Sequence, residues 1–349
     1  MNKKQKGQHM NGLILFAAFV FILWMGSSIF IPLLIAAFLW YLINATATYY
    51  RKMFPTTMRP LDKLYDFITN ILAAGTYVGL IYIFATRVRP MFSELMLSMP
   101  EIQASLNNLW NHISNRFGLD INALALPNIT TIVSSVGSSV AKIAASMGMI
   151  IVYMIFLFIE QGTFHKKFID LFSNKTQQKK AKYILSSIDI NMKKYLFMKT
   201  MISAVTGLIS YAWMYMLDLQ FAGVWAFAIF ILSYIPTIGA ILGCTMPILF
   251  AAIMGATLNQ MILISLGLVG IQIVFGNIIE PKLTGKTLNL STLAILINLV
   301  FWGLIWGVAG MFFSVPLLVA VFIITAQFDS TRWIAILLSA DGEIPDKDE

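Results

Sequence analysis

Long uncharged tracts alternate with short charged connections along this chain. Residues 219–279 contain no charged side chain, and residues 287–328 contain none either. Shorter, mainly apolar tracts cover residues 13–43, 68–86 and 147–159. A helix that crosses a bilayer needs about 20 predominantly apolar residues. The pattern therefore predicts an all-α polytopic membrane protein.

The composition supports a membrane location. The chain has 349 residues, of which 58% are hydrophobic and 11% charged, and its mean hydropathy is +0.79. An ordinary soluble domain carries about 25% charged residues. Because the apolar tracts recur through most of the length, they leave room only for short connections, and we expect one membrane unit over residues 1–349.

The positive charges indicate how the chain is oriented. The formal net charge is +8, and the basic residues cluster beside apolar tracts, as the positive-inside rule describes for cytoplasmic loops. Residues 161–199 hold nine lysines against Asp170 and Asp189. We therefore expect a basic cytoplasmic loop there, cytoplasmic N- and C-termini, and no nucleic-acid partner. Apolar residues between these lysines also suit a helix at the headgroup level of the lipid bilayer, with anionic lipid as its partner.

Six segments follow from these tracts and charges. They are N-terminal spans at 11–86, an external amphipathic region at 87–140, a span at 141–160, the basic loop at 161–199, a core at 200–328 and a cytoplasmic tail at 329–349. The first apolar tract is longer than one crossing requires and contains Gly26 and Pro32. We therefore expect two short spans that turn back within residues 13–43.

An amphipathic helix is expected in the external region. Apolar residues recur there at spacings of four and three, which is the stripe of one helical face: Leu95, Met99, Ile102, Leu106, Leu109 and Ile113. Pro100 suits the first turn of a helix, so we expect the helix to start there. Such a stripe packs against the rest of its own chain or against another subunit, and both alternatives stay open.

Two apolar tracts in the C-terminal half are interrupted. Residues 221–253 contain Pro236 and Gly239, and residues 290–326 contain Gly307, Gly310 and Pro316. Proline removes a helical hydrogen bond and glycine loosens the backbone, so each tract is expected to bend or break near its middle. Paired interrupted segments are typical of transporter binding sites. Re-entrant hairpins and kinked spans remain the two alternatives.

Three motifs in this half resemble those of a known family. They are YIPTIG at residues 234–239, NIIEPKLTGK at residues 277–286 and WGLIWGVAGM at residues 302–311. Their order and spacing resemble the AI-2E (autoinducer-2 exporter) family. The resemblance implies a bacterial-type inner-membrane protein with about eight membrane helices that forms a homo-oligomer such as a pentamer. It also implies movement of small solutes, with autoinducer-2 export in some relatives and sodium/proton exchange in others.

Glu280 is the central candidate because it is a lone carboxylate between two uncharged tracts. We expect one of two roles for it. Glu280 either takes up and releases a proton or cation during transport, or forms an ion pair with Lys282 or Lys286 at the membrane surface. Three side-chain amides lie in apolar tracts: Asn277, Gln272 and Asn298. We expect them either to bind a polar solute or to hold helices together by hydrogen bonds. The residues expected to shape the backbone of the transport core are Pro236, Gly239, Pro281, Gly285, Gly307, Gly310 and Pro316.

The sequence contains little that would support an enzymatic function. The three histidines fall in connections and Cys244 is the only cysteine, so we expect no metal site, no cofactor and no intramolecular disulfide. The leading hypothesis is an exporter of a small polar signalling molecule, autoinducer-2-like by the resemblance, that works by alternating access. The alternatives are a sodium(lithium)/proton antiporter, with a monovalent cation and a proton as its ligands, and a non-transporting membrane scaffold.

Overall fold

The structure is a computed structural model that describes residues 14–15, 17–53, 62–117, 145–284 and 289–344. Its labelled helices are α2 (Ser27–Met53), α3 (Asp62–Leu97), α4 (Met99–Phe117), α6 (Met147–Asp170), α7 (Lys175–Met216), α8 (Ala222–Leu232), α9 (Ile238–Ile253), α10 (Leu258–Gln272), the π-helix η3 (Ile273–Ile279), α11 (Glu280–Thr284), α12 (Thr292–Ala326) and α13 (Arg332–Leu338). Within the described residues, the β-structure is confined to an isolated bridge between Leu290 and Ser339. The predicted all-α class is confirmed.

Several of these helices are long and apolar enough to cross a membrane. In the described residues there are five such candidates: Ser27–Met53, Tyr65–Ile83, Met147–Asp170, Leu258–Leu283 and Thr292–Ala326. The helix α8 is shorter, since its 11 residues extend only about 16 Å against a hydrocarbon core of about 30 Å. The fold is that of a polytopic membrane protein in which long spans are combined with half-length helices.

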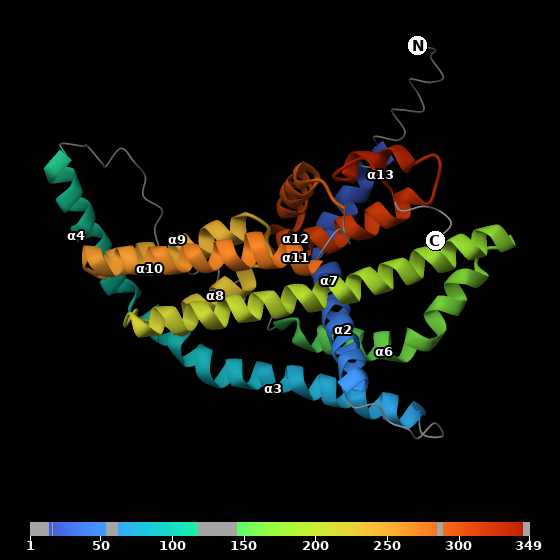
Figure 1. Cartoon of the computed structure of the whole chain (residues 1–349), viewed down its shortest axis with the longest axis horizontal. Coiled ribbons are helices and arrows are strands. Elements are labelled where there is room, and N and C mark those ends of the chain that lie inside the picture. The colour runs from blue at the N-terminus through green and yellow to red at the C-terminus, as the bar shows by residue number, and fades with distance from the viewer. Residues whose placement is uncertain (1–13, 16, 54–61, 118–144, 285–288, 345–349) are drawn as a thin grey trace, which may run out of the picture. The chain divides into compact units, whose positions relative to one another are not determined.

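The chain forms two compact units. Unit 1 comprises residues 1–42, 146–193 and 286–349, and unit 2 comprises residues 43–145 and 194–285. The helix α7 is continuous through the boundary at Lys193, and Figure 1 shows it as one long rod. Each unit contains one of the two interrupted tracts.

In unit 2, the interrupted tract is a helical hairpin made of α8 and α9. The rings of Trp225 on α8 and Phe250 on α9 lie 5.2 Å apart between centroids, and both belong to or pack against one apolar cluster. Thr237, in the turn, adopts a positive φ of 61°. Gly239 lies two residues further on and packs closely against α8. A Cβ at this position would overlap the carbonyl oxygen of Leu232. The predicted break at Pro236 and Gly239 is thus a reversal of the chain.

In unit 1, α12 is also a hairpin. Gly307 interrupts the helix with φ 60° and ψ −139°. The side chain of Asn298 donates from Nδ2 to the carbonyl oxygen of Ser314 over 2.6 Å, although 16 residues of straight helix would separate the two by about 24 Å. A Cβ at Gly310 would overlap the carbonyl of Trp302. Both interrupted tracts therefore fold back on themselves, and the kinked-span alternative is wrong for this fold.

The N-terminal tract is interrupted once in its described part. A turn at Gly26 precedes α2, which then runs through Pro32 and past Ile43 to Met53. Pro32 lies in the second turn of α2, and the helix continues through it although the Ser28 carbonyl, four residues earlier, loses its usual N–H donor. The prediction that Pro32 interrupts this tract is therefore wrong.

The amphipathic stripe packs on the hairpin of unit 2. Leu95, Met99 and Ile102 share a buried cluster with Val224 of α8 and Phe250 of α9. Pro100 is the second residue of α4, which confirms its expected place in the first turn. For this part of the stripe, packing against its own chain is confirmed, whereas residues 118–140 of the external region lie outside the described residues.

The region expected as a basic loop is almost wholly helical. It consists of the last turns of α6, a short turn at residues 171–174 and the first 25 residues of α7. Its lysines divide into two environments. Lys175, Lys179 and Lys182 are exposed, whereas Lys199 is buried with only 4% of its surface accessible. Lys199 was included in the expected basic loop at 161–199, whereas α7 carries it into the interior of unit 2.

Candidate functional site

Glu280 lies in unit 2 against a lysine from a distant part of the sequence. The Lys199 ammonium donates from Nζ to the Glu280 carboxylate at Oε1, and the two side chains are 5% and 25% exposed. Lys282, one of the expected local partners, has an exposed side chain, and Lys286 lies outside the described residues. The carboxylate is therefore held in an ion pair inside unit 2. The pair expected from the sequence was instead one with Lys282 or Lys286 at the membrane surface.

The backbone in front of Glu280 is a π-helix. Its residues Ile273–Ile279 lead directly into Glu280, whose N–H donates to the carbonyl of Phe275, five residues earlier. Pro281 follows and has no N–H, so the carbonyl one turn before it loses its helical donor. Single π-turns are frequent at functional sites because they free backbone groups and redirect side chains. The carboxylate thus sits where the helix already deviates from regular hydrogen bonding.

Hydroxyl groups complete a polar cluster around the pair. The Tyr234 hydroxyl donates to Thr200 Oγ1 over 2.7 Å, and Thr200 in turn donates to the carbonyl of Leu196 over 2.6 Å. Tyr195 is buried on α7, one turn before Lys199. We call the group Tyr195, Lys199, Thr200, Tyr234 and Glu280 the 280 cluster. It joins α7, the α8–α9 turn and the start of α11 within unit 2.

A buried polar stripe continues from this cluster along α7. Ser203, Thr206 and Ser210 follow Lys199 at helical spacing and are at most 2% exposed. Thr206 donates to the carbonyl of Ile202 over 2.8 Å. Beside the stripe, a Cβ added to Gly207 would lie 3.1 Å from the carbonyl oxygen of Ala226. Small residues here let α7 approach α8 closely, which is the usual basis of helix packing in membranes.

The predicted amides separate into different roles. Asn277 is exposed on the π-helix and Gln272 is partly buried just before it, so both lie on the segment that carries Glu280. Asn298 belongs to unit 1. It donates to the carbonyl of Ser314 and accepts from Trp302 Nε1 over 3.1 Å, and it therefore fastens the α12 hairpin.

The predicted backbone residues mostly mark the two hairpins. Pro236 and Gly239 lie at the α8–α9 turn, and Gly307 and Gly310 form the α12 turn. Pro316 is accommodated within the second arm of α12. Pro281 follows Glu280 directly, and Gly285 lies outside the described residues.

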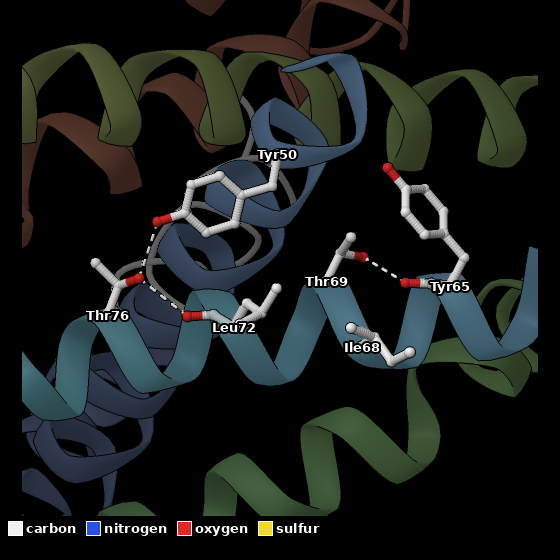
Figure 2. A pocket seen from close by; sticks show the side chains of 6 residues that line it. All are labelled: Tyr50, Tyr65, Ile68, Thr69, Leu72 and Thr76. Carbon is white, nitrogen blue, oxygen red and sulfur yellow. Dashed lines mark hydrogen bonds between the residues drawn. The ribbon is translucent and has the colours of Figure 1, made fainter. Parts of the chain in front are cut away.

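A pocket of about 280 Å³ in unit 2 lies elsewhere and brings no charged group together. Its lining comes from the end of α2 and the start of α3: Tyr50, Tyr65, Ile68, Thr69, Leu72 and Thr76. Figure 2 shows the Tyr50 hydroxyl bonded to Thr76 Oγ1, a distance of 2.9 Å. Thr69 turns instead to the backbone carbonyl of Tyr65, 3.0 Å away. Ile68 and Leu72 are 45% and 57% exposed, so this is a shallow apolar groove, and the 280 cluster remains the candidate site.

The motifs around the two hairpins correspond to a known family. A family model described as AI-2E family transporter matches residues 13–329. The chain belongs to the AI-2E family. It is thus a membrane transporter, and the resemblance inferred from its three motifs is confirmed.

Relatives in this family match over most of their length. The AI-2 transport protein TqsA of Escherichia coli (strain K12) is 28% identical over 321 residues, which is 90% of each chain. A Haemophilus influenzae protein is 31% identical over 219 residues, or 62% of each chain. YhhT of Escherichia coli (strain K12) is 25% identical over 295 residues, covering 83% of this chain and 82% of its own. The similarity to TqsA therefore extends through most of both chains.

Four members of the 280 cluster were not predicted as site residues, namely Tyr195, Lys199, Thr200 and Tyr234, and of these Lys199 carried a signal in the sequence. The apolar residues Phe197, Met198 and Met201 surround it, unlike the lysines earlier in α7. With Ser203, Thr206 and Ser210 it forms a polar stripe at spacings of four and three, which is the pattern of one helical face. A lysine that opens such a stripe next to an apolar span is a signal for a buried partner charge.

Proposed function

We propose that this transporter exports a small, polar, uncharged signalling molecule of the autoinducer-2 type by alternating access. The buried ion pair between Lys199 and Glu280 carries the proposal. Charged groups within membrane segments are costly and are typically kept for use. The similarity to TqsA, which is named as an AI-2 transport protein, supports the choice of solute class.

The charge balance of the pair favours an uncharged solute. The ammonium and the carboxylate cancel, so the 280 cluster offers strong hydrogen-bond groups without a net charge that would select an ion. Glu280 accepts from solute hydroxyls, and Lys199 donates to hydroxyl or carbonyl oxygens. Hydrogen bonds to charged groups contribute about 1.5–3 kcal/mol each, which is enough to select a polyol-like solute.

The broken helices supply the route in this proposal. Half-length helices beside a polar cluster let a solute reach mid-membrane from either side as the surrounding helices move. We assign the protein to the inner membrane, as the family resemblance implies, with cytoplasmic N- and C-termini, because the densest group of basic residues lies in the connection expected on that side. A homo-oligomer, such as a pentamer, is part of the same proposal.

Efflux from proteoliposomes tests the assignment. E280Q removes the carboxylate charge while it keeps the side-chain shape, and K282Q removes an exposed charge two residues away as a matched control. We expect E280Q to lower efflux of an autoinducer-2-type solute by about tenfold or more, the factor that corresponds to one charged hydrogen bond. K282Q should export at the wild-type rate. Wild-type efflux from E280Q would refute the role of the cluster.

Cation/proton exchange is a second candidate, because the same carboxylate already holds a cation. A sodium ion, a lithium ion or a proton would replace the Lys199 ammonium on Glu280, with a backbone carbonyl freed by Pro281 as a further oxygen ligand. A sodium gradient should then drive proton movement in proteoliposomes, and E280Q should abolish it. Solute efflux that is independent of sodium excludes this candidate. If neither flux exceeds that of empty liposomes, the scaffold alternative is favoured.

A further inference from the structure

The tip between α6 and α7 is a hydrogen-bonded corner within unit 1. The turn at residues 171–174 is closed by side chains: the Thr176 N–H donates to Asn174 Oδ1 over 2.9 Å, and Gln178 Nε2 donates to the carbonyl of Phe172 over 2.7 Å. Asn174 thus caps the first turn of α7. We call this corner, residues 164–182, the basic tip.

One face of the basic tip is positively charged. Lys175, Lys179 and Lys182 are exposed and follow each other at spacings of four and three, so they share one face of α7. Lys180 adds a fourth charge nearby. The sequence contains no acidic residue between Asp170 and Asp189, so this face has no acidic neighbour along the helix to neutralise it.

Large apolar side chains accompany these charges. Leu171 is 75% exposed and Phe164 is 52% exposed. The rings of Phe164 and Phe168 on α6 and of Phe172 in the turn follow one another at centroid distances of 6.3 Å and 5.8 Å. This row continues the apolar stretch that begins at Met147, and aromatic and lysine residues in such a position are typical of the membrane interface.

The connection of the tip to α6 keeps its lysines near the bilayer. α6 (Met147–Asp170) is itself a candidate span, and the turn at residues 171–174 joins its end directly to the lysine-bearing start of α7. Lysines that follow a span so closely are expected at the headgroup level of the bilayer.

We propose that the basic tip docks on the headgroups of anionic phospholipids. Lys175, Lys179 and Lys182 contact lipid phosphates, while Leu171 and Phe164 enter the headgroup region. Each lysine near an anionic surface adds about a factor of five to the docking equilibrium. A docking site on an acidic soluble protein is less favourable, because it would leave no reason for exposed apolar residues that continue a membrane helix.

A spin label at Leu171 measures the docking directly. Cys244 is the only cysteine and is buried, so the C244A/L171C variant carries one label in the full chain. It is placed in nanodiscs of phosphatidylcholine alone or with phosphatidylglycerol. We expect the label in anionic discs to gain accessibility to oxygen and to lose accessibility to a water-soluble nickel chelate. Added salt at about 1 M should weaken this shift, because the Debye length falls to about 3 Å.

Charge variants decide whether the tip is responsible. K175Q/K179Q/K182Q should weaken docking by about 100-fold and so remove the difference between the two lipid compositions. K3Q/K4Q/K6Q removes the same number of charges at the N-terminus and should leave the shift intact. A label equally accessible to nickel in both discs overturns the proposal, and so does an equal loss in both charge variants. Both readouts are independent of transport, so they stand or fall separately from the proposed function.

Discussion

The indole N–H of Trp306 donates to the backbone carbonyl of Leu23 over 2.9 Å, and so the turn of the α12 hairpin is joined to the break in the N-terminal helical tract. In an unbroken helix this carbonyl would accept from the N–H of residue 27. The turn at Gly26 makes it available to a side chain instead. Trp306 is 8% exposed and packs with Leu23 and Ile305 in one buried cluster of unit 1.

Trp306→Phe is expected to destabilise unit 1, because it leaves the Leu23 carbonyl buried without its donor. Such a group costs about 1–3 kcal/mol, and the phenyl ring also fills less volume than the indole. Thermal unfolding in detergent should show a lower midpoint for this variant. Trp333→Phe is the control, since Trp333 is 60% exposed and should unfold as wild type. Equal midpoints for W306F and the wild type would contradict the assigned role.

The pair between Lys199 and Glu280 should be strongly coupled. Lys199→Ala leaves a carboxylate without its ammonium in the interior of unit 2, and such a loss typically costs about 3–5 kcal/mol. The lower end is expected here because Glu280 keeps 25% exposure. Removing both charges in K199Q/E280Q should restore part of the stability, since no uncompensated charge remains.

A double-mutant cycle measures that coupling. Unfolding free energies of the wild type, K199Q, E280Q and the double variant give the interaction energy of the pair. Substitutions at distant sites are additive to within about 0.5 kcal/mol, and the interaction energy of this pair should be larger than that. The cycle of K282Q with K199Q serves as the control, because Lys282 is exposed, and its coupling should be near zero. Additive effects in the first cycle would show that the ion pair contributes nothing to folding.

Local sequence patterns predicted much of the fold, but they did not predict which residue forms the ion pair with Glu280. Gly239 and Gly310 marked both hairpin turns, because each position requires a residue without a Cβ. Pro100 marked the start of α4 in the same local manner. The partner of Glu280 comes from Lys199, 81 residues away in the sequence, and no single-helix periodicity specifies which helices meet. Lys199 was grouped with the basic loop because eight other lysines precede it in residues 161–199.

Replacing glycine by alanine should lower the stability at a hairpin turn and raise it inside a regular helix. At Gly239 a Cβ would overlap the carbonyl oxygen of Leu232, so Gly239→Ala must displace backbone and is expected to cost about 1–3 kcal/mol, as overpacking does. At Gly270, inside α10, a Cβ would meet nothing within 4 Å, and Gly270→Ala should stabilise by about 0.5–1 kcal/mol. Opposite shifts in thermal midpoint test this, and a neutral G239A would show that the turn is not tightly packed.

The base of the α12 hairpin is fastened to the C-terminal segment by Asn289. Its Nδ2 donates to Asp341 Oδ1 over 2.7 Å and to the carbonyl of Glu343 over 3.0 Å. The Ala340 N–H donates to the Asn289 carbonyl over 3.0 Å, beside the bridge between Leu290 and Ser339. The residue has a positive φ of 36°, a conformation that asparagine and glycine tolerate better than other residues.

Two substitutions at Asn289 separate the side chain from the backbone. Asn289→Gly loses the two side-chain hydrogen bonds but accepts the positive φ, whereas Asn289→Ala loses the bonds and strains the backbone by about a further 1 kcal/mol. Protease cleavage of the C-terminal segment in detergent should therefore accelerate in the order wild type, N289G, N289A. If N289G is cleaved at the wild-type rate while N289A is fast, the fastening comes from backbone conformation alone. If both match the wild type, Asn289 does not hold the segment, and the Ala340 and Leu290 backbone contacts suffice.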